Sequence, residues 1–166
     1  MGSRALAAYK CPMRRRISHH GLLLMLLCVA LLAGCASAPR AREATVGERI
    51  AAGALAQIGR PYHFGGSTPE GFDCSGLVRY AHLAVGVDVP RTTTEQFRAA
   101  RPIRRSKLAP GDLLFFRIDS RDVTHVAIYT GNRRFVHAPQ SGKSVETREL
   151  DDDWYRDRLV STGRLY

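Results

Sequence analysis

The spacing of hydrophobic residues changes near Pro110, and this change constrains the fold more than any other feature of the sequence. Before it, apolar residues recur three and four positions apart, which predicts helices at 46–58, 74–85 and 93–100. After it come β-rich runs at Asp112–Ile118, Thr124–Tyr129, Arg134–Ala138, Val145–Leu150 and Leu159–Leu165. The gaps between these runs are typical of antiparallel pairing. The order predicts an α+β domain, with helices packed on one face of an antiparallel sheet of about five strands.

Residues 1–34 resemble a secretory leader. They carry five cations and no acid, and their apolar run, 22–32, is shorter than the roughly 20 residues that a membrane-spanning helix needs. The four residues that end at Cys35, Leu-Ala-Gly-Cys, are similar to the bacterial lipobox, in which the cysteine is lipidated and becomes the first residue of the mature protein. Ala36, in place of aspartate, favours delivery to the outer membrane. The alternatives are an ordinary secretory signal and a start of translation at Met13.

We therefore expect a cleaved signal peptide at 1–34, a tether at 35–44 that anchors the protein in a membrane through Cys35, and one domain at 45–166. Residues 35–166 carry 20 cations and 15 acids, so the net charge falls from +10 to +5 when the leader is removed. This small excess argues against a nucleic-acid partner. The basic segment 98–107 either contacts an anionic polymer, such as lipid headgroups or cell wall, or is a solvated surface. We expect a monomer.

Cysteine usage leaves one free thiol in the expected domain. Of the four cysteines, Cys11 and Cys28 leave with the leader and Cys35 carries the lipid, so Cys74 remains alone and no disulfide is expected. Cys74 follows a glycine-rich loop and begins a predicted helix, where unpaired amides and the helix dipole favour an anion. We therefore expect a lowered thiol pKa and a nucleophilic role for Cys74. The alternative is a small buried cysteine that packs as a hydrophobic residue.

A cysteine nucleophile needs a base, and the expected domain holds four histidines: His63, His82, His125 and His137. His82 lies eight residues beyond Cys74 on the same predicted helix, too far along the axis to reach the thiol. A surface or packing role is therefore expected for His82. His125 and His137 fall on consecutive predicted strands, which makes them the better candidates.

The predicted hairpin brings these two imidazoles together. We expect a three-residue turn, 130–132, that places His125 directly opposite His137 with Cβ atoms about 5 Å apart, because a two-residue turn would send the rings to opposite faces. This arrangement predicts Cys74 as nucleophile, His125 as general base and then acid, and His137 as the orienting group. Zinc held by the same three side chains is a rival interpretation, although no metal-binding motif supports it. Each histidine alone also fits an ordinary hydrogen-bonded sheet residue.

Six sequence blocks occur in a fixed order. They are Pro61-Tyr62-His63-Phe64-Gly65-Gly66, Phe72-Asp73-Cys74-Ser75-Gly76-Leu77-Val78, Pro90-Arg91-Thr92-Thr93-Thr94-Glu95-Gln96, Pro110-Gly111-Asp112-Leu113, Thr124-His125-Val126-Ala127-Ile128-Tyr129 and Phe135-Val136-His137-Ala138-Pro139. Over about residues 44–166 the chain resembles the NlpC/p60 family of bacterial cell-wall cysteine peptidases. The resemblance implies a papain-like α+β core, a triad of Cys74, His125 and His137, and no cofactor or metal. It also implies hydrolysis, through a thioester, of peptide bonds in peptidoglycan stem peptides or cross-links.

The same resemblance implies roles for three further residues. Tyr62 would help to hold the oxyanion or the substrate, together with the backbone N–H of Cys74, and Asp73 and Ser75 would contact the substrate. The alternatives are that Tyr62 is an ordinary loop aromatic and that Asp73 only caps a helix. Thr124 stands where serine is frequent in the family, and this departure touches no catalytic group.

Two other classes of function fit the sequence. One is a non-catalytic cell-wall-binding lipoprotein that uses segment 98–107, and the other is an acyltransferase that uses the same thiol and imidazole. For a peptidase, the bond between D-glutamate and diaminopimelate within a stem and the bond between D-alanine and diaminopimelate in a cross-link both fit.

Overall fold

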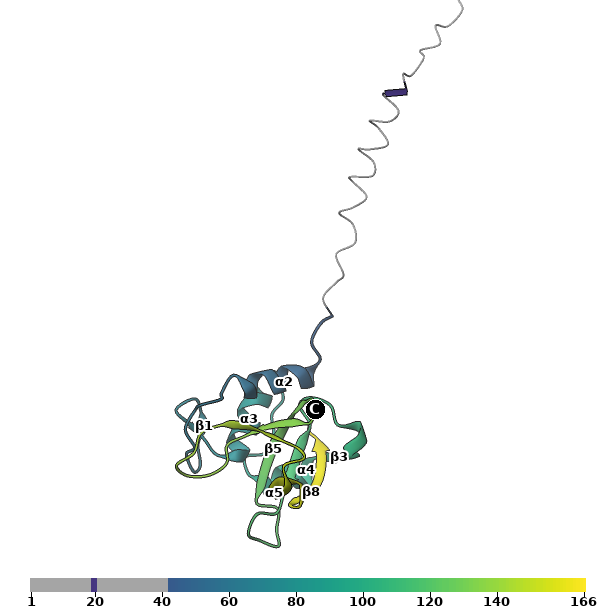
Figure 1. The fold of residues 1–166 in the computed structure, drawn as a ribbon. Coiled ribbons are helices and arrows are strands. Elements are labelled where there is room, and N and C mark those ends of the chain that lie inside the picture. Colours follow the sequence, from purple (N-terminus) through teal and green to yellow (C-terminus); the bar gives the residue numbers. More distant parts are fainter. Residues whose placement is uncertain (1–18, 21–41) are drawn as a thin grey trace, which may run out of the picture. The chain divides into compact units, whose positions relative to one another are not determined.

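Figure 1 shows the computed structural model, which describes residues 19–20 and 42–166. The expected signal peptide, the expected lipidation at Cys35 and most of the expected tether lie outside the described residues. Residues Glu43–Tyr166 form one compact unit. No helix among the described residues is both long and apolar enough to cross a membrane.

Three helices precede the strands of the main sheet: α2 (Val46–Leu55), α3 (Cys74–Leu83) and α4 (Thr93–Ala99). Each follows a residue whose side chain accepts a hydrogen bond from a backbone N–H of the first turn, namely Thr45, Asp73 and Thr92. The two threonine caps are reciprocal capping boxes with a glutamate three positions later. The three predicted helices are confirmed, although each ends slightly earlier than its apolar spacing predicted.

The main sheet has six antiparallel strands in the order β3-β8-β4-β5-β6-β7. The strands are β3 (Arg101–Pro102), β4 (Leu113–Phe116), β5 (His125–Gly131), β6 (Arg134–His137), β7 (Glu146–Glu149) and β8 (Leu159–Arg164). The last five confirm the predicted strands, and the α+β class is confirmed with them. Strand β3 was not predicted, because two residues are too few to show alternation. Strand β8 does not continue the meander but pairs with the free side of β4.

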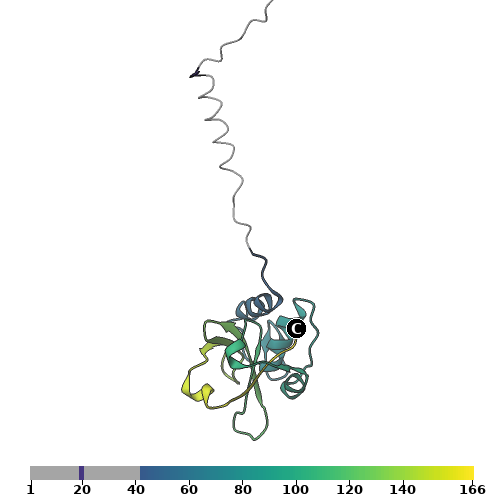
Figure 2. The same cartoon turned by 90° about the vertical axis from the view of Figure 1, so that its right-hand side faces the viewer.

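Short elements fill the connections between the helices and the main sheet. A two-stranded sheet of β1 (Ser67–Thr68) and β2 (Gly71–Phe72) leads through Asp73 directly into α3. The short 3-10 helix η1 (Arg105–Lys107) follows β3, and α5 (Asp153–Arg156) lies between β7 and β8. Figure 2 shows the yellow α5 well apart from the blue α2.

Both faces of the central strands are buried. In β4, Leu113 and Phe115 pack in the cluster that contains α2 and α3, whereas Leu114 and Phe116 pack in a second cluster with Tyr155 of α5. A strand buried on both faces needs no polar side, which explains the continuous run Leu-Leu-Phe-Phe. The domain is therefore a sheet with the large helices on one face and a smaller aromatic cluster on the other.

The β5–β6 hairpin brings His125 and His137 to one face, but not by the expected turn. The turn contains two residues, Asn132 and Arg133, both with positive φ (49° and 57°). Such a turn alone would put the two histidines on opposite faces, but a bulge beyond Tyr129 shifts the register and restores the common face. The predicted three-residue turn is therefore wrong, and His137 lies diagonally across from His125 rather than directly opposite.

Candidate active site

Cys74 is the first residue of α3, and its sulfur lies 3.4 Å from the hydroxyl of Thr93 at the start of α4. Burial raises the pKa of the Cys74 thiol, although hydrogen bonds from Thr93 and from the backbone N–H groups of Val126 and Ser75 act in the opposite direction. The expectation of a lowered pKa is therefore wrong for the free protein, because desolvation outweighs the favourable position at a helix N-terminus. The thiol rests in its neutral form.

The two predicted imidazoles are in direct contact. His125 Nε2 lies 2.9 Å from His137 Nδ1, and the ring planes are nearly perpendicular, at 83°. The two residues are only 4% and 1% exposed, and Phe116 and Phe135 pack against them. Burial lowers the pKa of His125 to about 4, and burial followed by the proximity of His125 lowers the pKa of His137 as well. Both rings are therefore neutral near pH 7, and one donates its N–H to the other.

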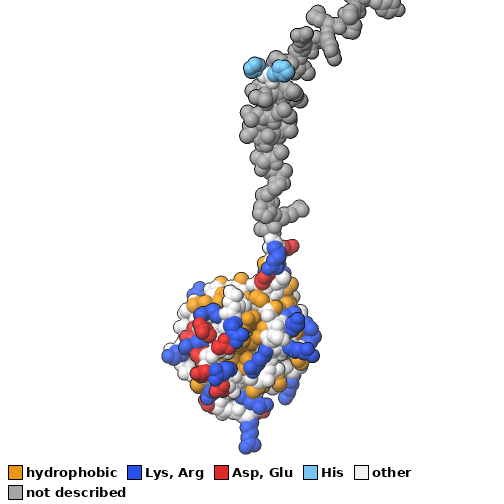
Figure 3. Space-filling view, turned by 45° about the vertical axis from the view of Figure 1, so that its right-hand side comes forward, with side chains coloured by type: hydrophobic (Ala, Val, Ile, Leu, Met, Phe, Trp, Pro, Cys, Tyr) orange, Lys and Arg blue, Asp and Glu red, His pale blue; other side chains and the backbone are white. Residues whose placement is uncertain are grey.

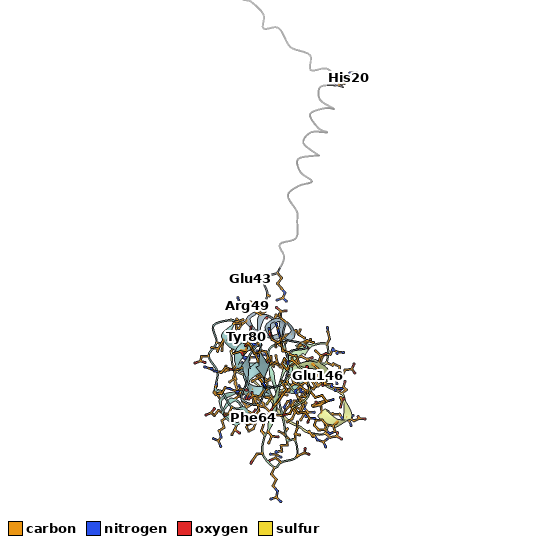
Figure 4. The ribbon with its side chains drawn as sticks, turned by 90° about the vertical axis from the view of Figure 1, so that its left-hand side faces the viewer. His20, Glu43, Arg49, Phe64, Tyr80 and Glu146 are labelled. Carbon is orange, nitrogen blue, oxygen red and sulfur yellow. The ribbon has the colours of Figure 1, made fainter. Side chains whose placement is uncertain are left out.

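His137 is held on its outer side by two residues that were not predicted. The Tyr155 hydroxyl lies 3.4 Å from His137 Nε2, and a Glu146 carboxylate oxygen lies 3.7 Å from the same nitrogen. Glu146 also pairs with Arg148 at 2.8 Å. Figure 4 labels Glu146, which comes from β7. No local pattern in the sequence marks these residues, because strand register and the position of α5 bring them to His137.

One arrangement of protons fits these contacts and leaves a base. A proton on His137 Nε2, the nitrogen that faces the Glu146 carboxylate, leaves His137 Nδ1 to accept the N–H of His125 Nε2. His125 Nδ1 then carries a lone pair. Within the described residues this nitrogen makes no hydrogen bond, and His125 lines a cavity. This is the form that a general base requires.

The sulfur and the first imidazole lie at the same end of β5. His125 begins the strand, and the backbone N–H of the next residue, Val126, interacts with the Cys74 thiol. Because α3 packs on one face of the sheet and the rings pack on the other, the thiol and His125 lie on either side of this strand end. In the part of the chain that the structure describes, the hydrogen bond of the thiol goes to Thr93 and to neither imidazole.

Asp73 caps α3 and is also the centre of a buried network. Arg91 donates to its two carboxylate oxygens at 2.9 and 2.7 Å, and the backbone N–H groups of Gly65 and Gly76 donate to them at 3.0 and 2.6 Å. The Ser75 hydroxyl donates to the same carboxylate at 3.2 Å. Burial opposes ionisation of Asp73, but the hydrogen bonds from Arg91 hold its pKa below the usual value. The polar atoms of Asp73 and Ser75 are thus engaged with the chain, and their contact with substrate stays a prediction.

Tyr62 lies within electrostatic range of Cys74. Burial raises the pKa of Tyr62, and the proximity of Cys74 and Asp73 raises it further. The hydroxyl is therefore protonated and able to donate, although its role at the oxyanion stays a prediction. Phe64, labelled in Figure 4, lies on the same loop with 90% of its surface exposed.

The other two histidines of the domain are not part of this cluster. His82 is fully buried on α3, where its Nδ1 lies 2.8 Å from the carbonyl oxygen of Val78, and burial lowers its pKa. Its expected packing role is confirmed. His63 is exposed and packs beside Gly71. Within the described ranges, no group of three or more His, Cys, Asp or Glu residues is arranged to hold a metal ion.

A cavity of about 320 Å³ borders His125 on the side of α5. Its lining carries charges of both signs, from Lys143, Glu146 and Arg148, beside the aromatic ring of Tyr155. A base with a free nitrogen, a thiol at the same strand end and an adjoining polar cavity form an arrangement suited to nucleophilic attack on a polar substrate.

Comparison with known proteins identifies the domain. Residues 59–164 match the sequence profile of the NlpC/P60 family. The chain belongs to the NlpC/P60 family. The matched range contains Cys74, His125 and His137, and all six sequence blocks that suggested the resemblance.

Two relatives illustrate the similarity in sequence. The chain is 43% identical over 116 residues to murein DD-endopeptidase MepH of Escherichia coli. It is 41% identical over 121 residues to the bifunctional muramidase/DL-endopeptidase CwlT of Bacillus subtilis. The alignments cover 67% and 71% of this chain but 43% and 36% of those relatives, so the chain spans less than half of their length.

Solved NlpC/P60 structures have the same fold. NlpC1 of Trichomonas vaginalis superimposes with a TM-score of 0.70 at 32% identity, covering 76% of this chain and 46% of that one. The NlpC/p60 domain of the peptidoglycan hydrolase SagA gives a TM-score of 0.62 at 39% identity, covering 70% of this chain and 97% of that domain. The predicted papain-like α+β fold is confirmed by these similarities.

Proposed function

We propose that this NlpC/P60 domain is a cysteine peptidase that hydrolyses peptide bonds of peptidoglycan, with Cys74 as nucleophile, His125 as base and His137 as orienting group. The observation that carries the proposal is the 2.9 Å contact between the imidazoles, at the end of β5 whose next backbone N–H interacts with the thiol. The names of the relatives, which include murein DD-endopeptidase and DL-endopeptidase, support the substrate class.

The chemistry follows from the neutral resting state. As the Cys74 sulfur attacks the peptide carbonyl carbon, His125 Nδ1 takes the thiol proton and a C–S bond forms. Collapse of the tetrahedral intermediate breaks the C–N bond, and the same nitrogen gives its proton to the departing amine. Water then attacks the thioester, His125 takes a proton from that water, and the acid product leaves as the sulfur regains the proton. His137 holds the ring of His125 through both half-reactions and stabilises its charged form.

The developing oxyanion has two candidate donors in this chain. The backbone N–H of Cys74, first in α3, has no acceptor within its own helix, and the hydroxyl of Tyr62 is held protonated by its raised pKa. Asp73 and Arg91 position the loop and helix start between these two groups. We assign Asp73 and Ser75 a positioning role in addition to the predicted contact with substrate.

The cellular setting is also a proposal. We propose that lipid on Cys35 anchors a monomeric protein at the periplasmic face of the outer membrane, supported by the Leu-Ala-Gly-Cys sequence and the alanine that follows it. Cys35→Ser should abolish metabolic labelling with palmitate and release the protein from the membrane fraction. Retention of either property in that variant would contradict the anchor.

Digestion of purified muropeptides, followed by mass analysis, tests the peptidase. Cys74→Ala and His125→Ala should lower the cleavage rate by about 10⁴-fold or more while circular dichroism stays that of the folded protein. Thr124→Ser is the matched control, because the serine hydroxyl keeps the hydrogen bonds to Ile118 and stands beside the base without touching it. Unchanged turnover in Cys74→Ala would refute the assignment. Products that contain an added amine in place of water would identify an acyltransferase.

A further inference from the structure

A second cavity, of about 300 Å³, lies between α4 and the loop that joins β4 to β5. We call it the arginine cavity, and its main lining residues are Thr94, Phe97 and Arg98 from α4 and Arg117, Arg121 and Val123 from the loop. Asp122 is the one acid that lines it. The three α4 residues share one helix face, because they lie three and four positions apart.

Among the described residues, the three arginines of the arginine cavity are not held in ion pairs, although the charge of Arg98, after hydrogen bonds from Thr92, helps to lower the pKa of Glu95. Within the described part of the chain, none of Arg98, Arg117 and Arg121 makes a side-chain hydrogen bond or an ion pair. Seven arginines elsewhere in the domain are paired with acids, namely Arg79, Arg91, Arg133, Arg134, Arg148, Arg156 and Arg164, whereas others that the structure describes, such as Arg101 and Arg104, are in no ion pair. The cavity gathers three arginines that are outside any ion pair around one hollow, where they are available to an anion from outside the chain.

The sequence that contains the three arginines of the cavity also carries an excess of positive charge. Residues 98–121 contain seven arginines and lysines but only two acids, and one of these, Asp112, is buried in a 2.6 Å ion pair with Arg164. In Figure 3, Lys and Arg on one side of the domain lie beside Asp and Glu, whereas on the other side they stand without acidic neighbours. This bias favours anionic ligands over cationic ones at the cavity.

Each wall of the arginine cavity includes a residue that is close in sequence to a contact of the thiol. Thr93, which lies 3.4 Å from the Cys74 sulfur, directly precedes Thr94 of the cavity wall. On the other wall, Val123 packs against the same core cluster as Cys74, three residues before the backbone N–H that interacts with the thiol. A peptide whose carbonyl carbon reaches the sulfur can therefore extend a neighbouring group into the cavity.

We propose that the arginine cavity is a subsite that binds a free carboxylate of the peptide substrate, through Arg117 and Arg121 with Arg98 beside them. The inference rests on the proposed function for its substrate class, since stem peptides of peptidoglycan carry carboxylates beside their peptide bonds. Closeness to the sulfur favours a substrate group over a lipid surface. Arginine suits this task, because its planar fork matches the geometry of a carboxylate.

Binding measured without cleavage tests the subsite. Calorimetric titration uses the Cys74→Ala protein and one stem peptide in two forms, with free carboxylates and with those carboxylates converted to amides. The acid form should bind about tenfold more tightly than the amide form. Arg117→Gln/Arg121→Gln should remove this preference, and the matched pair Arg101→Gln/Arg104→Gln should keep it within twofold, since it deletes the same charge outside the cavity lining.

Three results would overturn the subsite: equal binding of acid and amide, equal effects of the two double variants, or no binding of either peptide at millimolar concentration. A parallel experiment measures how much of the protein sediments with anionic phospholipid vesicles. Loss of vesicle binding in the cavity variant, with no preference for the acid peptide, would assign the cavity to a membrane surface instead. Cleavage by the wild-type protein is measured separately. If the protein cleaves the peptide but shows no preference for the acid form, only the subsite is rejected. If it prefers the acid form but does not cleave the peptide, only the peptidase activity is rejected.

Discussion

At Cys74, two electrostatic effects act on one thiol in opposite directions. The start of α3 favours the thiolate, whereas burial favours the neutral thiol, and burial wins. The pKa of His125 is lowered by burial too, so the protein does not rest as a thiolate–imidazolium pair. Proton transfer from sulfur to nitrogen must then accompany attack on the substrate. This follows from contacts that the sequence pattern does not contain, because desolvation depends on everything that surrounds the residue.

Alkylation of Cys74 by iodoacetamide reports this pKa directly. Because only the thiolate reacts and its pKa is raised, the alkylation rate should rise with pH with a midpoint above about 8.5, the value of a free cysteine. Thr93→Val should move the midpoint higher, since it removes a hydrogen bond that favours the thiolate. Thr94→Val, next along α4, should leave it unchanged. A midpoint below pH 7 would restore the ion-pair interpretation.

Arg91 should be costly to remove, because its partner, Asp73, is buried. Arg91→Gln leaves the Asp73 carboxylate, only 8% exposed, without its bidentate cation, and should lower the free energy of unfolding by about 2 kcal/mol. Arg134→Gln, which breaks an exposed pair with Glu149, should cost less than about 1 kcal/mol. Urea unfolding measures both. If the two variants lose the same free energy of unfolding, the buried network around Asp73 adds no more to stability than an exposed ion pair does.

At the scale of elements, the β5–β6 turn decides whether the imidazoles can meet. Asn132 adopts a positive φ, which asparagine tolerates and a β-branched residue does not. Asn132→Val should therefore lower the free energy of unfolding by about 1 kcal/mol or more. Ser141→Val, at an exposed loop position without positive φ, is the control and should change it by less than about 0.5 kcal/mol. Thermal or urea unfolding distinguishes the two, and similar values would show that the turn is not constrained.

The elements themselves were largely predictable because their signals are local. The capping boxes at Thr45 and Thr92 and the cap at Asp73 each mark a helix start within four residues of sequence. The common face of His125 and His137 was predicted correctly, but for the wrong reason. A two-residue turn and a bulge together have the same parity as the expected three-residue turn, and alternation cannot distinguish them.

At the scale of the whole molecule, several unpredicted features join segments that are distant in sequence. Arg91 reaches Asp73 across 18 residues, Tyr155 reaches His137 across 18, and β8 returns to pair with β4. Each depends on the packing of the entire sheet, with helices on one face and the aromatic cluster around Tyr155 on the other. The contact between His125 and His137 was predictable from residue type and spacing, whereas the contacts of Tyr155 and Glu146 with His137 were not.

Three histidines buried in the neutral form should make the whole domain sensitive to mild acid. Burial lowers the pKa values of His82, His125 and His137, so the unfolded chain binds more protons below about pH 6.5 and the free energy of unfolding falls as pH decreases from there. For His125 alone, with a folded pKa of about 4, the loss between pH 7 and pH 5 is about 2 kcal/mol. Urea unfolding at the two pH values measures it. His82→Phe should reduce the difference without touching the imidazole pair, and His63→Gln, at an exposed position, should leave it unchanged. Equal stability of the wild-type protein at both pH values would contradict the neutral burial of these rings.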